Sequence, residues 1–253
     1  MTSEARGHRA NDCTNDRSTA LAIGAVVLAA GSGSRLAGRP KSLLALDGVP
    51  LICRLLAALA AAGVSRVVVV LGHYADTIET VIATAVETTF APPMFNVAAI
   101  QTVTVVRNPA PDDGQASSLR LGLSALAGPL DAVIVALADQ PLIDAIAVTA
   151  LIDAFRAARA GSAADVNDEL AGGVMVVPRV AGKPGNPVVI DATVRAQWLQ
   201  GDPNLAGRHW RETHPERVHW FDTDIGAYRV DIDTPEDMAR FVAQSKRELV
   251  WPN

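Results

Sequence analysis

Short apolar runs rich in valine and isoleucine recur along this chain and alternate with segments long enough to form helices. Such runs are typical of strands that are buried on both faces of a parallel sheet. The predicted strands are 22–28, 66–71, 103–107, 131–137, 173–178, 187–190 and 228–232. The predicted helices are 50–62, 75–87, 117–127, 144–160 and one that Thr234 caps. The pattern therefore predicts an α/β fold with a mostly parallel central sheet.

The length and composition indicate one globular domain. The chain has 253 residues, of which 49% are hydrophobic and 19% charged, and a chain of this size can bury a substantial core. The first 20 residues are polar and lack the apolar core of a secretory signal. We therefore expect a disordered tail at 1–20 and one domain at 21–253, with a loop insertion at 86–99 and a surface loop at 165–169.

Charge and cysteine usage narrow the partners and the compartment. The net charge of -5 argues against binding to nucleic acid, which requires a basic face. No apolar stretch reaches the roughly 20 residues that a membrane-spanning helix needs. Cys13 and Cys53 have no metal-ligand spacing. Read as free thiols, they indicate a reducing cytoplasm.

A glycine-rich segment, Leu28-Ala-Ala-Gly-Ser-Gly-Ser-Arg35, follows the first predicted strand, and Lys41 comes shortly after it. Backbone N–H groups in such a loop can bind phosphate oxygens. The dinucleotide fingerprint fits poorly because Leu36 stands where the third glycine belongs. The P-loop pattern also fails, because Arg39-Pro40 replaces the lysine and hydroxyl residue. A loop of amides with two cations, Arg35 and Lys41, suits a triphosphate.

The segment LAAGSGSRLAGRPKSLLALDGVPLI closely resembles the signature of the molybdenum cofactor cytidylyltransferase family. Further blocks resemble that family in the same order: Asn108 to Leu123, Ala136-Leu-Ala-Asp-Gln-Pro-Leu142, Gly185-Asn-Pro-Val188 and Asp231-Ile-Asp-Thr-Pro-Glu-Asp237. The likeness spans residues 24 to about 240. It implies a Rossmann-like three-layer nucleotidyltransferase fold of the glycosyltransferase-A type.

The resemblance implies a metal-assisted site. Asp139, after the fourth predicted strand, and Asp233, near the chain's end, match the family's ligands for Mg²⁺. Asp231 shares a side with Asp233 if the segment is a strand, so it is a further candidate ligand or a partner of backbone donors. Arg35 and Lys41 would act with Asp139 as the catalytic residues, neutralising charge on the phosphates. The alternative for Asp139 is a structural role at a strand end.

Further residues are predicted to bind the two substrates. The nucleotide-binding candidates are Leu28, Ala29, Ala30, Gly31, Ser32, Gly33, Ser34, Ser117, Ser118 and Arg120. The alternatives are helix capping for the serines and a solvated charge for Arg120. The candidates for the acceptor side are Gly185, Asn186 and Pro187, whose alternative is an ordinary turn.

The sequence departs from the family pattern in the loop. The family usually has lysine five residues after the arginine, whereas Lys41 comes six after Arg35, which weakens the prediction for Lys41. Leu28-Ala-Ala-Gly31 differs from the Leu-Ala-Gly-Gly of related guanylyltransferases. CTP is therefore favoured over GTP.

Three functions follow. The leading hypothesis is a transfer of CMP from CTP to the phosphate of a molybdopterin-type cofactor, with release of pyrophosphate, in the maturation of a molybdenum hydroxylase. The second is a cytidylyl- or guanylyltransferase acting on another phosphorylated small molecule. The third is a non-catalytic chaperone that carries the cofactor. The presence of Arg35, Lys41, Asp139 and Asp233 favours an enzyme.

Overall fold

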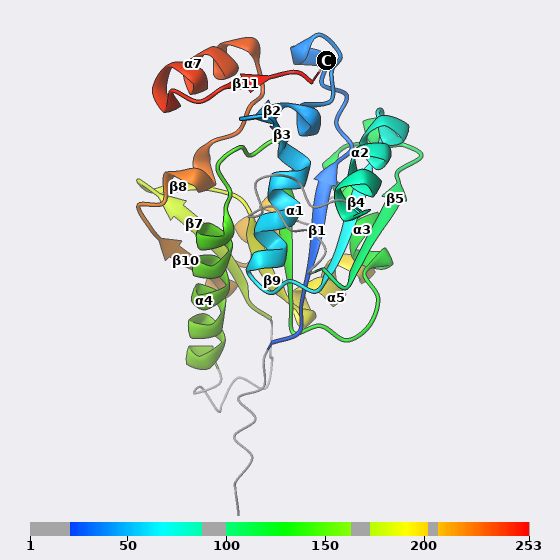
Figure 1. Ribbon diagram of the computed structural model, residues 1–253. Helices are drawn as coiled ribbons and strands as arrows, with labels where there is room; N and C mark the ends of the chain where they lie inside the picture. The colour runs from blue at the N-terminus through cyan, green and yellow to red at the C-terminus, as the bar shows by residue number, and fades with distance from the viewer. Residues whose placement is uncertain (1–20, 88–99, 163–172, 202–206, 253) are drawn as a thin grey trace, which may run out of the picture.

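The computed structural model describes residues 21–87, 100–162, 173–201 and 207–252, which form layers around one large sheet (Figure 1). The helices are α1 (Leu51–Ala61), α2 (Ala75–Glu87), α3 (Gln115–Ala125), α4 (Ala145–Ser162), α5 (Ala192–Gln200), α6 (Arg208–Thr213) and α7 (Pro235–Ser245). The longer strands are β1 (Ile23–Ala29), β4 (Arg66–Leu71), β5 (Thr102–Arg107), β6 (Ala132–Leu137), β7 (Met175–Val180), β9 (Val188–Asp191) and β10 (Val218–Asp222). The short strands are β2 (Ala45–Leu46), β3 (Val49–Pro50), β8 (Lys183–Pro184) and β11 (Leu249–Val250).

Several segments for which the sequence makes predictions lie outside the residues that the structure describes. The predicted tail at 1–20, most of the insertion at 86–99 and the loop at 165–169 lie outside the described residues. Cys13 lies outside them too, whereas Cys53 is a buried free thiol on α1. Among the described residues, no helix combines the length and hydropathy that a membrane span requires.

The large sheet has the order β10-β7-β9-β6-β1-β4-β5, and β8 pairs with β7. β1 runs parallel to β4 and β6, β4 to β5, and β7 to β10. β9 is antiparallel to both of its neighbours. The prediction of an α/β fold with a mostly parallel sheet is therefore confirmed.

The strands are buried on both faces, as their apolar runs predict. In β1, Ala25 and Val27 face one core cluster together with residues of α1 and α4, while Val26 faces a second cluster with residues of α3 and α5. Successive side chains of a strand point to opposite faces, so an uninterrupted apolar run supplies both clusters. The sheet thus separates two helical layers.

Helix ends follow local sequence signals. α1 ends at Ala61 because Gly63 has a positive φ of 84°. The N–H of Gly63 donates to the carbonyl of Ala60, and the N–H of Val64 donates to that of Leu59. This pair of bonds is the glycine-dependent Schellman ending of a helix. α3 differs from expectation: it begins at Gln115 after Gly114 with no side-chain cap, so the prediction of a serine cap is wrong.

One predicted strand is also wrong. Of the residues in 228–232, the first two belong to the 3-10 helix η6 (Gly226–Arg229), and the other three are in no strand. Tyr228 packs into one large core cluster, whereas Ile232 packs into a small third cluster. The alternation of apolar residues therefore arises because this segment bridges two cores. The strand that does form the edge next to β7 is β10, which the sequence analysis missed because it is half exposed and has no continuous apolar run.

The third cluster joins distant parts of the chain beyond the carboxyl end of β1 (Figure 1). β2 pairs with β3 and β11 in a small antiparallel sheet, and α7 lies beside this sheet. Leu36, from the loop after β1, is buried there with Phe241 of α7 and Leu249 of β11. The end of the chain thereby supports the segment that follows β1.

Candidate active site

The sheet order places a crevice at the carboxyl ends of β1 and β6. From β1 the chain proceeds outward to β4 and β5, and then returns to the other side of β1 as β6. Ligands of open α/β sheets bind at such a reversal of strand order. The glycine-rich loop leaves β1 here, and Asp139 follows β6. The N–H of Ala138 donates to the carbonyl of Leu28 at 3.1 Å, so the two segments start side by side.

The glycine-rich loop folds into a tight turn that requires glycine. Gly33 has φ +59°, and a Cβ on it would lie 1.9 Å from the carbonyl oxygen of Arg39. Its own carbonyl accepts hydrogen bonds from the N–H groups of Leu36 and Gly38, at 2.8 and 3.1 Å. Two short 3-10 helices follow, η1 (Ser34–Leu36) and η2 (Lys41–Leu43). The turn brings Lys41 back to the crevice.

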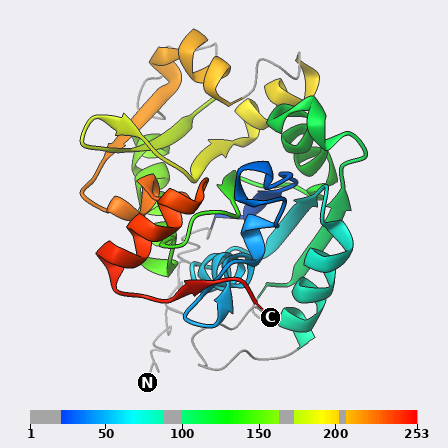
Figure 2. The ribbon, with the colours of Figure 1, turned by 90° about the horizontal axis from the view of Figure 1, so that it is seen from above.

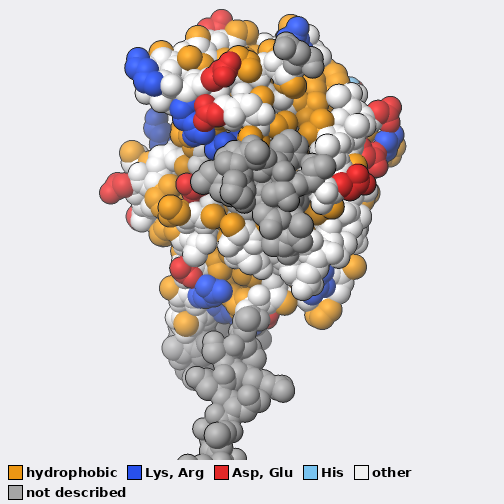
Figure 3. All heavy atoms as spheres, in the orientation of Figure 1, with side chains coloured by type: hydrophobic (Ala, Val, Ile, Leu, Met, Phe, Trp, Pro, Cys, Tyr) orange, Lys and Arg blue, Asp and Glu red, His pale blue; other side chains and the backbone are white. Residues whose placement is uncertain are grey.

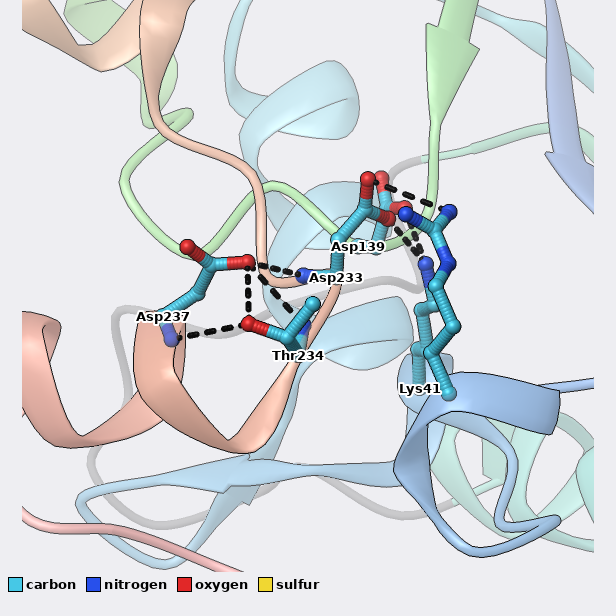
Figure 4. A network of polar contacts seen from close by, with 6 residues as sticks. Lys41, Asp139, Asp233, Thr234 and Asp237 are labelled. Atoms are coloured by element: carbon cyan, nitrogen blue, oxygen red, sulfur yellow. Dashed lines mark hydrogen bonds and ion pairs between the residues drawn. The ribbon is translucent and has the colours of Figure 1, made fainter.

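Four charged side chains meet in the crevice (Figure 4). The ammonium group of Lys41 hydrogen-bonds to Asp233 and lies 3.6 Å from Asp139 Oδ2. A guanidinium nitrogen of Arg35 lies 3.3 Å from Asp233 Oδ2. The structure thus brings together Arg35, Lys41, Asp139 and Asp233, although they come from three separate parts of the sequence. The extra residue before Lys41 does not keep its ammonium group from either aspartate.

The start of α7 fixes the position of Asp233. Thr234 and Asp237 form a capping box, in which the Thr234 hydroxyl accepts from the Asp237 N–H. Asp237 Oδ2 accepts from the backbone N–H groups of Asp233 and Thr234, at 3.2 and 3.0 Å (Figure 4). The N–H of Ile232 also donates to the carbonyl of Asp139 at 3.1 Å. The predicted cap is therefore present, and the separate Ile232 bond connects the backbone next to Asp233 to that of Asp139.

Asp139 is held in an unfavourable environment for a carboxylate. Burial raises its pKa above the ordinary value of 3.8; the charge of Lys41 opposes the rise, while Asp233 and Asp231 add to it. Its Oδ1 atom is buried and accepts no hydrogen bond from the described residues. An unsatisfied buried carboxylate oxygen is costly. This oxygen has the free coordination capacity that a cation would use.

The acidic residues fit a magnesium site to which the substrate also contributes ligands. Mg²⁺ is usually held by one or two carboxylates together with phosphates and water, and it seldom has an all-protein cage. Asp139 and Asp233 supply that number of carboxylates, and each of them forms an ion pair with Lys41. Within the described residues, no three acidic, histidine or cysteine side chains are arranged to hold a metal by themselves. Asp231 is exposed and lies near enough to Asp139 to raise its pKa.

A small pocket of about 90 Å³ lies beside this charged group. Its lining consists of Leu28, Ala29, Gly31, Pro40, Lys41, Ser42, Ala138 and Asp139. Part of the predicted nucleotide loop therefore faces the same space as two predicted catalytic residues. Of the remaining loop residues, Ala30 is buried, whereas Arg35 is 63% exposed.

The second predicted nucleotide block is organised by Asn108, a buried residue to which the sequence analysis gave no role beyond the start of that block. The Asn108 side-chain amide lies 2.9 Å from the hydroxyls of both Ser117 and Ser118. Arg120 donates to the carbonyl of Gly201 at 2.7 Å. These contacts give all three predicted residues internal partners, and their role toward a nucleotide stays a prediction.

The predicted acceptor block lies against η6. A Cβ on Gly185 would lie 2.5 Å from the carbonyl oxygen of Tyr228, and the Asn186 N–H donates to that oxygen. The buried Gln140 side chain donates to the carbonyl of Asn186 at 3.0 Å. Pro187 follows a cis peptide bond. Gln140, next to Asp139, thus connects the metal-binding candidates to the acceptor block.

Tyr74 is the other residue that the sequence did not reveal. Its hydroxyl lies 2.7 Å from the carbonyl oxygen of Ser32 and 2.5 Å from that of Gly38. A tyrosine between a strand and a helix carries no signal of this role in the sequence. Its contact with the loop follows from the adjacency of β1 and β4 in the sheet.

Electrostatic patterning fits a small-molecule site. On the face shown in Figure 3, the described basic and acidic side chains are intermixed, and no continuous basic surface is seen. A triphosphate with a bound divalent cation is anionic and would instead need positive charge at the site itself, which Lys41 and Arg35 provide. The crevice therefore combines a glycine turn, two cations and two carboxylates, which suits phosphoryl chemistry.

Comparisons with known proteins agree with this description. The sequence model of the MobA-like NTP transferase domain matches residues 25–218. Nicotine blue oxidoreductase of Paenarthrobacter nicotinovorans is 30% identical over 220 residues, covering 86% of this chain and 95% of that protein.

Solved structures extend the likeness to the fold. A nucleotidyl transferase from Methanothermobacter thermautotroptrophicus has 25% identity and a TM-score of 0.60, covering 88% of this chain and 96% of its own. A manganese complex of the Mycobacterium tuberculosis protein Rv0371C has 22% identity and a TM-score of 0.58, covering 87% of this chain and 98% of its own. The nucleotidyltransferase fold expected from the sequence is thereby confirmed.

Proposed function

This chain belongs to the MobA-like NTP transferase domain family, and we propose that it transfers CMP from CTP to the phosphate of a molybdopterin-type cofactor. The observation that carries this proposal is the meeting of Lys41, Asp139 and Asp233 beside the glycine-rich loop. That the chain is a nucleotidyltransferase follows from the family; the choice of CTP and of the acceptor is the proposal.

The charged residues have complementary tasks in such a reaction. An oxygen of the acceptor phosphate forms a bond to the α-phosphorus of CTP, and the bond from that phosphorus to the bridging oxygen of pyrophosphate breaks. Both reactants are anionic, so negative charge must be neutralised for the approach. Arg35 and Lys41 supply two positive charges beside the loop. The pyrophosphate departs with the electron pair, and no protein nucleophile takes part.

Asp139 and Asp233 are the residues that would hold Mg²⁺. The ion would supply charge neutralisation on the triphosphate. The unsatisfied Oδ1 of Asp139 supports this role, and the manganese complex of a protein with the same fold supports the use of a divalent cation. Asp231 is the reserve candidate, because its charge acts on Asp139.

The backbone of the loop supports the assignment of the nucleotide side. Residues 28–34 would bind the triphosphate, and Ala30 distinguishes the loop from the guanylyltransferase pattern. Ser117, Ser118 and Arg120 complete the proposed nucleotide block. Gly185, Asn186 and Pro187 would face the acceptor, because Gln140 links them to Asp139 through the chain and through a hydrogen bond. We propose a cytoplasmic enzyme that serves a molybdenum hydroxylase.

The experiment is an assay of pyrophosphate release from CTP with Mg²⁺, with and without molybdenum cofactor. We expect release that requires both substrates and that Asp139→Ala abolishes. Asp153→Ala, which changes an exposed carboxylate on α4, is the matched control and should retain activity. Full activity of the Asp139 variant would refute the metal role. Release with another phosphorylated acceptor, and none with the cofactor, would refute the acceptor.

Base preference needs a separate measurement. Thermal unfolding with CTP, GTP or ATP at one concentration, each with Mg²⁺, compares the three nucleotides directly. At equal concentration the nucleotide with the lowest Kd stabilises the folded state most, by about 2.7 kcal/mol when it is at 100 times its Kd. We expect the largest shift with CTP. An equal or larger shift with GTP would overturn the choice of cytidine.

A second candidate function is an oxidoreductase activity. It is favoured by the relative that is named an oxidoreductase and is 30% identical over 220 residues. An oxidoreductase on this fold predicts no pyrophosphate release with any triphosphate and acceptor. Nucleotide binding with release of pyrophosphate would favour the transferase.

A further inference from the structure

The turn between β4 and α2 lies directly against the glycine-rich loop. A Cβ on Gly72 would lie 2.5 Å from the carbonyl oxygen of Ala30, so the two backbones pack as closely as glycine permits. Tyr74 follows, and α2 begins at Ala75. The Tyr74 ring is partly buried against the core cluster that α1 and α4 share. The ring is therefore anchored in the fold while its hydroxyl reaches the loop.

The hydroxyl of Tyr74 spans the loop. It lies 2.7 Å from the Ser32 carbonyl oxygen and 2.5 Å from the Gly38 carbonyl oxygen. These residues stand on either side of the segment that contains Arg35. A phenol has a single hydrogen to donate, so the hydroxyl serves the two acceptors in turn. Neither carbonyl can rotate away without losing this donor.

Fixing the Ser32 carbonyl also fixes an N–H group. In a trans peptide, the C=O and the following N–H point in opposite directions across one plane. The Gly33 N–H belongs to the same peptide plane as the Ser32 carbonyl, so it points away from Tyr74. No acceptor among the described residues receives this N–H. It is free to donate to a ligand on the far side of the loop.

We propose that Tyr74 is a positioning residue of the nucleotide site: its hydroxyl holds the glycine-rich loop so that the Gly33 N–H faces the triphosphate. This inference rests on the proposed function, because it requires that the loop binds a nucleoside triphosphate. Tyr74 itself touches no phosphate. It acts through the backbone, by keeping the loop in its binding conformation before the nucleotide arrives.

The test is Tyr74→Phe, which removes the hydroxyl and keeps the ring. The lost hydrogen bond weakens nucleotide binding in the ground state and the transition state alike, so KM rises while kcat stays nearly constant. We expect the calorimetric Kd for CTP with Mg²⁺, and the KM, to rise about three- to tenfold, as for the loss of one hydrogen bond. Amide exchange in residues 31–39 of the free protein should become faster.

The chain offers a matched control, because it has only two tyrosines. Tyr228 donates its hydroxyl to the carbonyl of Ala147 at 2.6 Å, within the core. Tyr228→Phe removes the same group from the same kind of bond. It should lower the unfolding temperature at least as much as Tyr74→Phe does, and leave the Kd for CTP within about twofold of the wild type.

The outcomes separate two failures. If the wild type binds CTP and Tyr74→Phe binds it equally well, the positioning role is refuted and the proposed function stands. If both tyrosine variants weaken CTP binding equally, the effect of Tyr74 is one of general stability and the positioning role is likewise refuted. If the wild type binds no nucleoside triphosphate, the proposed function falls and the role of Tyr74 falls with it.

Discussion

Lys41 lies between Asp139 and Asp233, where a divalent cation bound with a triphosphate would also interact. In the free protein, its ammonium group neutralises two carboxylates that would otherwise repel each other. A metal ion bound there would therefore compete with Lys41 for the same two carboxylates. A bound triphosphate would change this balance, because it would offer Lys41 new anionic partners and add ligands for the metal.

Lys41→Met should therefore increase the affinity for Mn²⁺ in the absence of nucleotide. We expect a gain of about tenfold, equivalent to ~1.4 kcal/mol, measured by titration with detection of free Mn²⁺ by electron paramagnetic resonance. The same variant should bind CTP more weakly. Lys183→Met, on the exposed part of β8, serves as the control and should leave both affinities unchanged. Unchanged or weaker Mn²⁺ binding by Lys41→Met would contradict the competition.

The raised pKa of Asp139 predicts a pH-dependent cost to folding. The folded state holds the proton on Asp139 more tightly than the unfolded chain, whose value is close to 3.8. Stability from this group is thus greatest at low pH, declines as pH rises from 3.8 through the raised pKa, and stays reduced above it. Asp139→Asn removes the titrating carboxyl and keeps its shape. At neutral pH the variant should be at least as stable as the wild type.

Urea unfolding at a series of pH values measures this effect. The difference in stability between Asp139→Asn and the wild type should shift in favour of the variant as pH rises through that interval. Asp153→Asn changes an exposed position that is paired with Arg156. This variant should not gain stability relative to the wild type as pH rises. A variant that is strongly destabilised at neutral pH would show that the carboxylate supports the fold instead of straining it.

At the scale of elements, α7 connects stability to the site. Its capping box holds the N–H of Asp233 through Asp237, so the cap orients one of the two carboxylates. Thr234→Ala should lower the free energy of unfolding by about 1 kcal/mol. It should also reduce kcat/KM for pyrophosphate release, because Asp233 loses its fixed position.

Asp191 provides the comparison for this prediction. It is the N-cap of α5, and its side chain accepts from the N–H of Val194. Asp191→Ala should cost a similar amount of stability in a chemical denaturation experiment and leave kcat/KM close to that of the wild type. Equal losses of activity in the two variants would mean that the cap of α7 has no specific connection to the site.

Across the whole molecule, the site depends on residues from both ends of the chain. The match to the family domain ends at residue 218, yet Leu36 of the glycine-rich segment packs in a cluster with Phe241 and Leu249. Figure 2 shows α7 and the segment after β1 at the same end of the molecule. The C-terminal segment thus completes the support of the glycine-rich loop.

Phe241→Ala tests this dependence. Removal of a buried phenylalanine should destabilise the protein by about 3–5 kcal/mol and raise the Kd for CTP at temperatures where the variant remains folded. Phe155→Ala removes a buried ring from α4 in the cluster on one face of the large sheet. It should destabilise the protein comparably, with a smaller effect on CTP binding. The reverse order of effects on Kd would refute a supporting role for α7.

The local sequence predicted most elements because its signals act over short distances. The strand at 66–71 and the helix at 75–87 agree with the structure residue for residue, since an apolar run and a helical period are each complete within one segment. The prediction at 228–232 was wrong because its alternating residues enter two different cores. β10 was missed because it is half exposed and has no continuous apolar run.

By itself the sequence determined the α/β class, the glycine turn after the first strand and the identity of Asp139 and Asp233 as acidic candidates. Only the tertiary structure decided that these aspartates share Lys41. It also decided that Tyr74 hydrogen-bonds to the loop and that the start of α7 holds Asp233. The reason is physical: a turn or a strand follows from interactions between near neighbours, whereas the meeting of residues 41, 139 and 233 requires the reversal of strand order at β1 and the packing of the C-terminal segment above it.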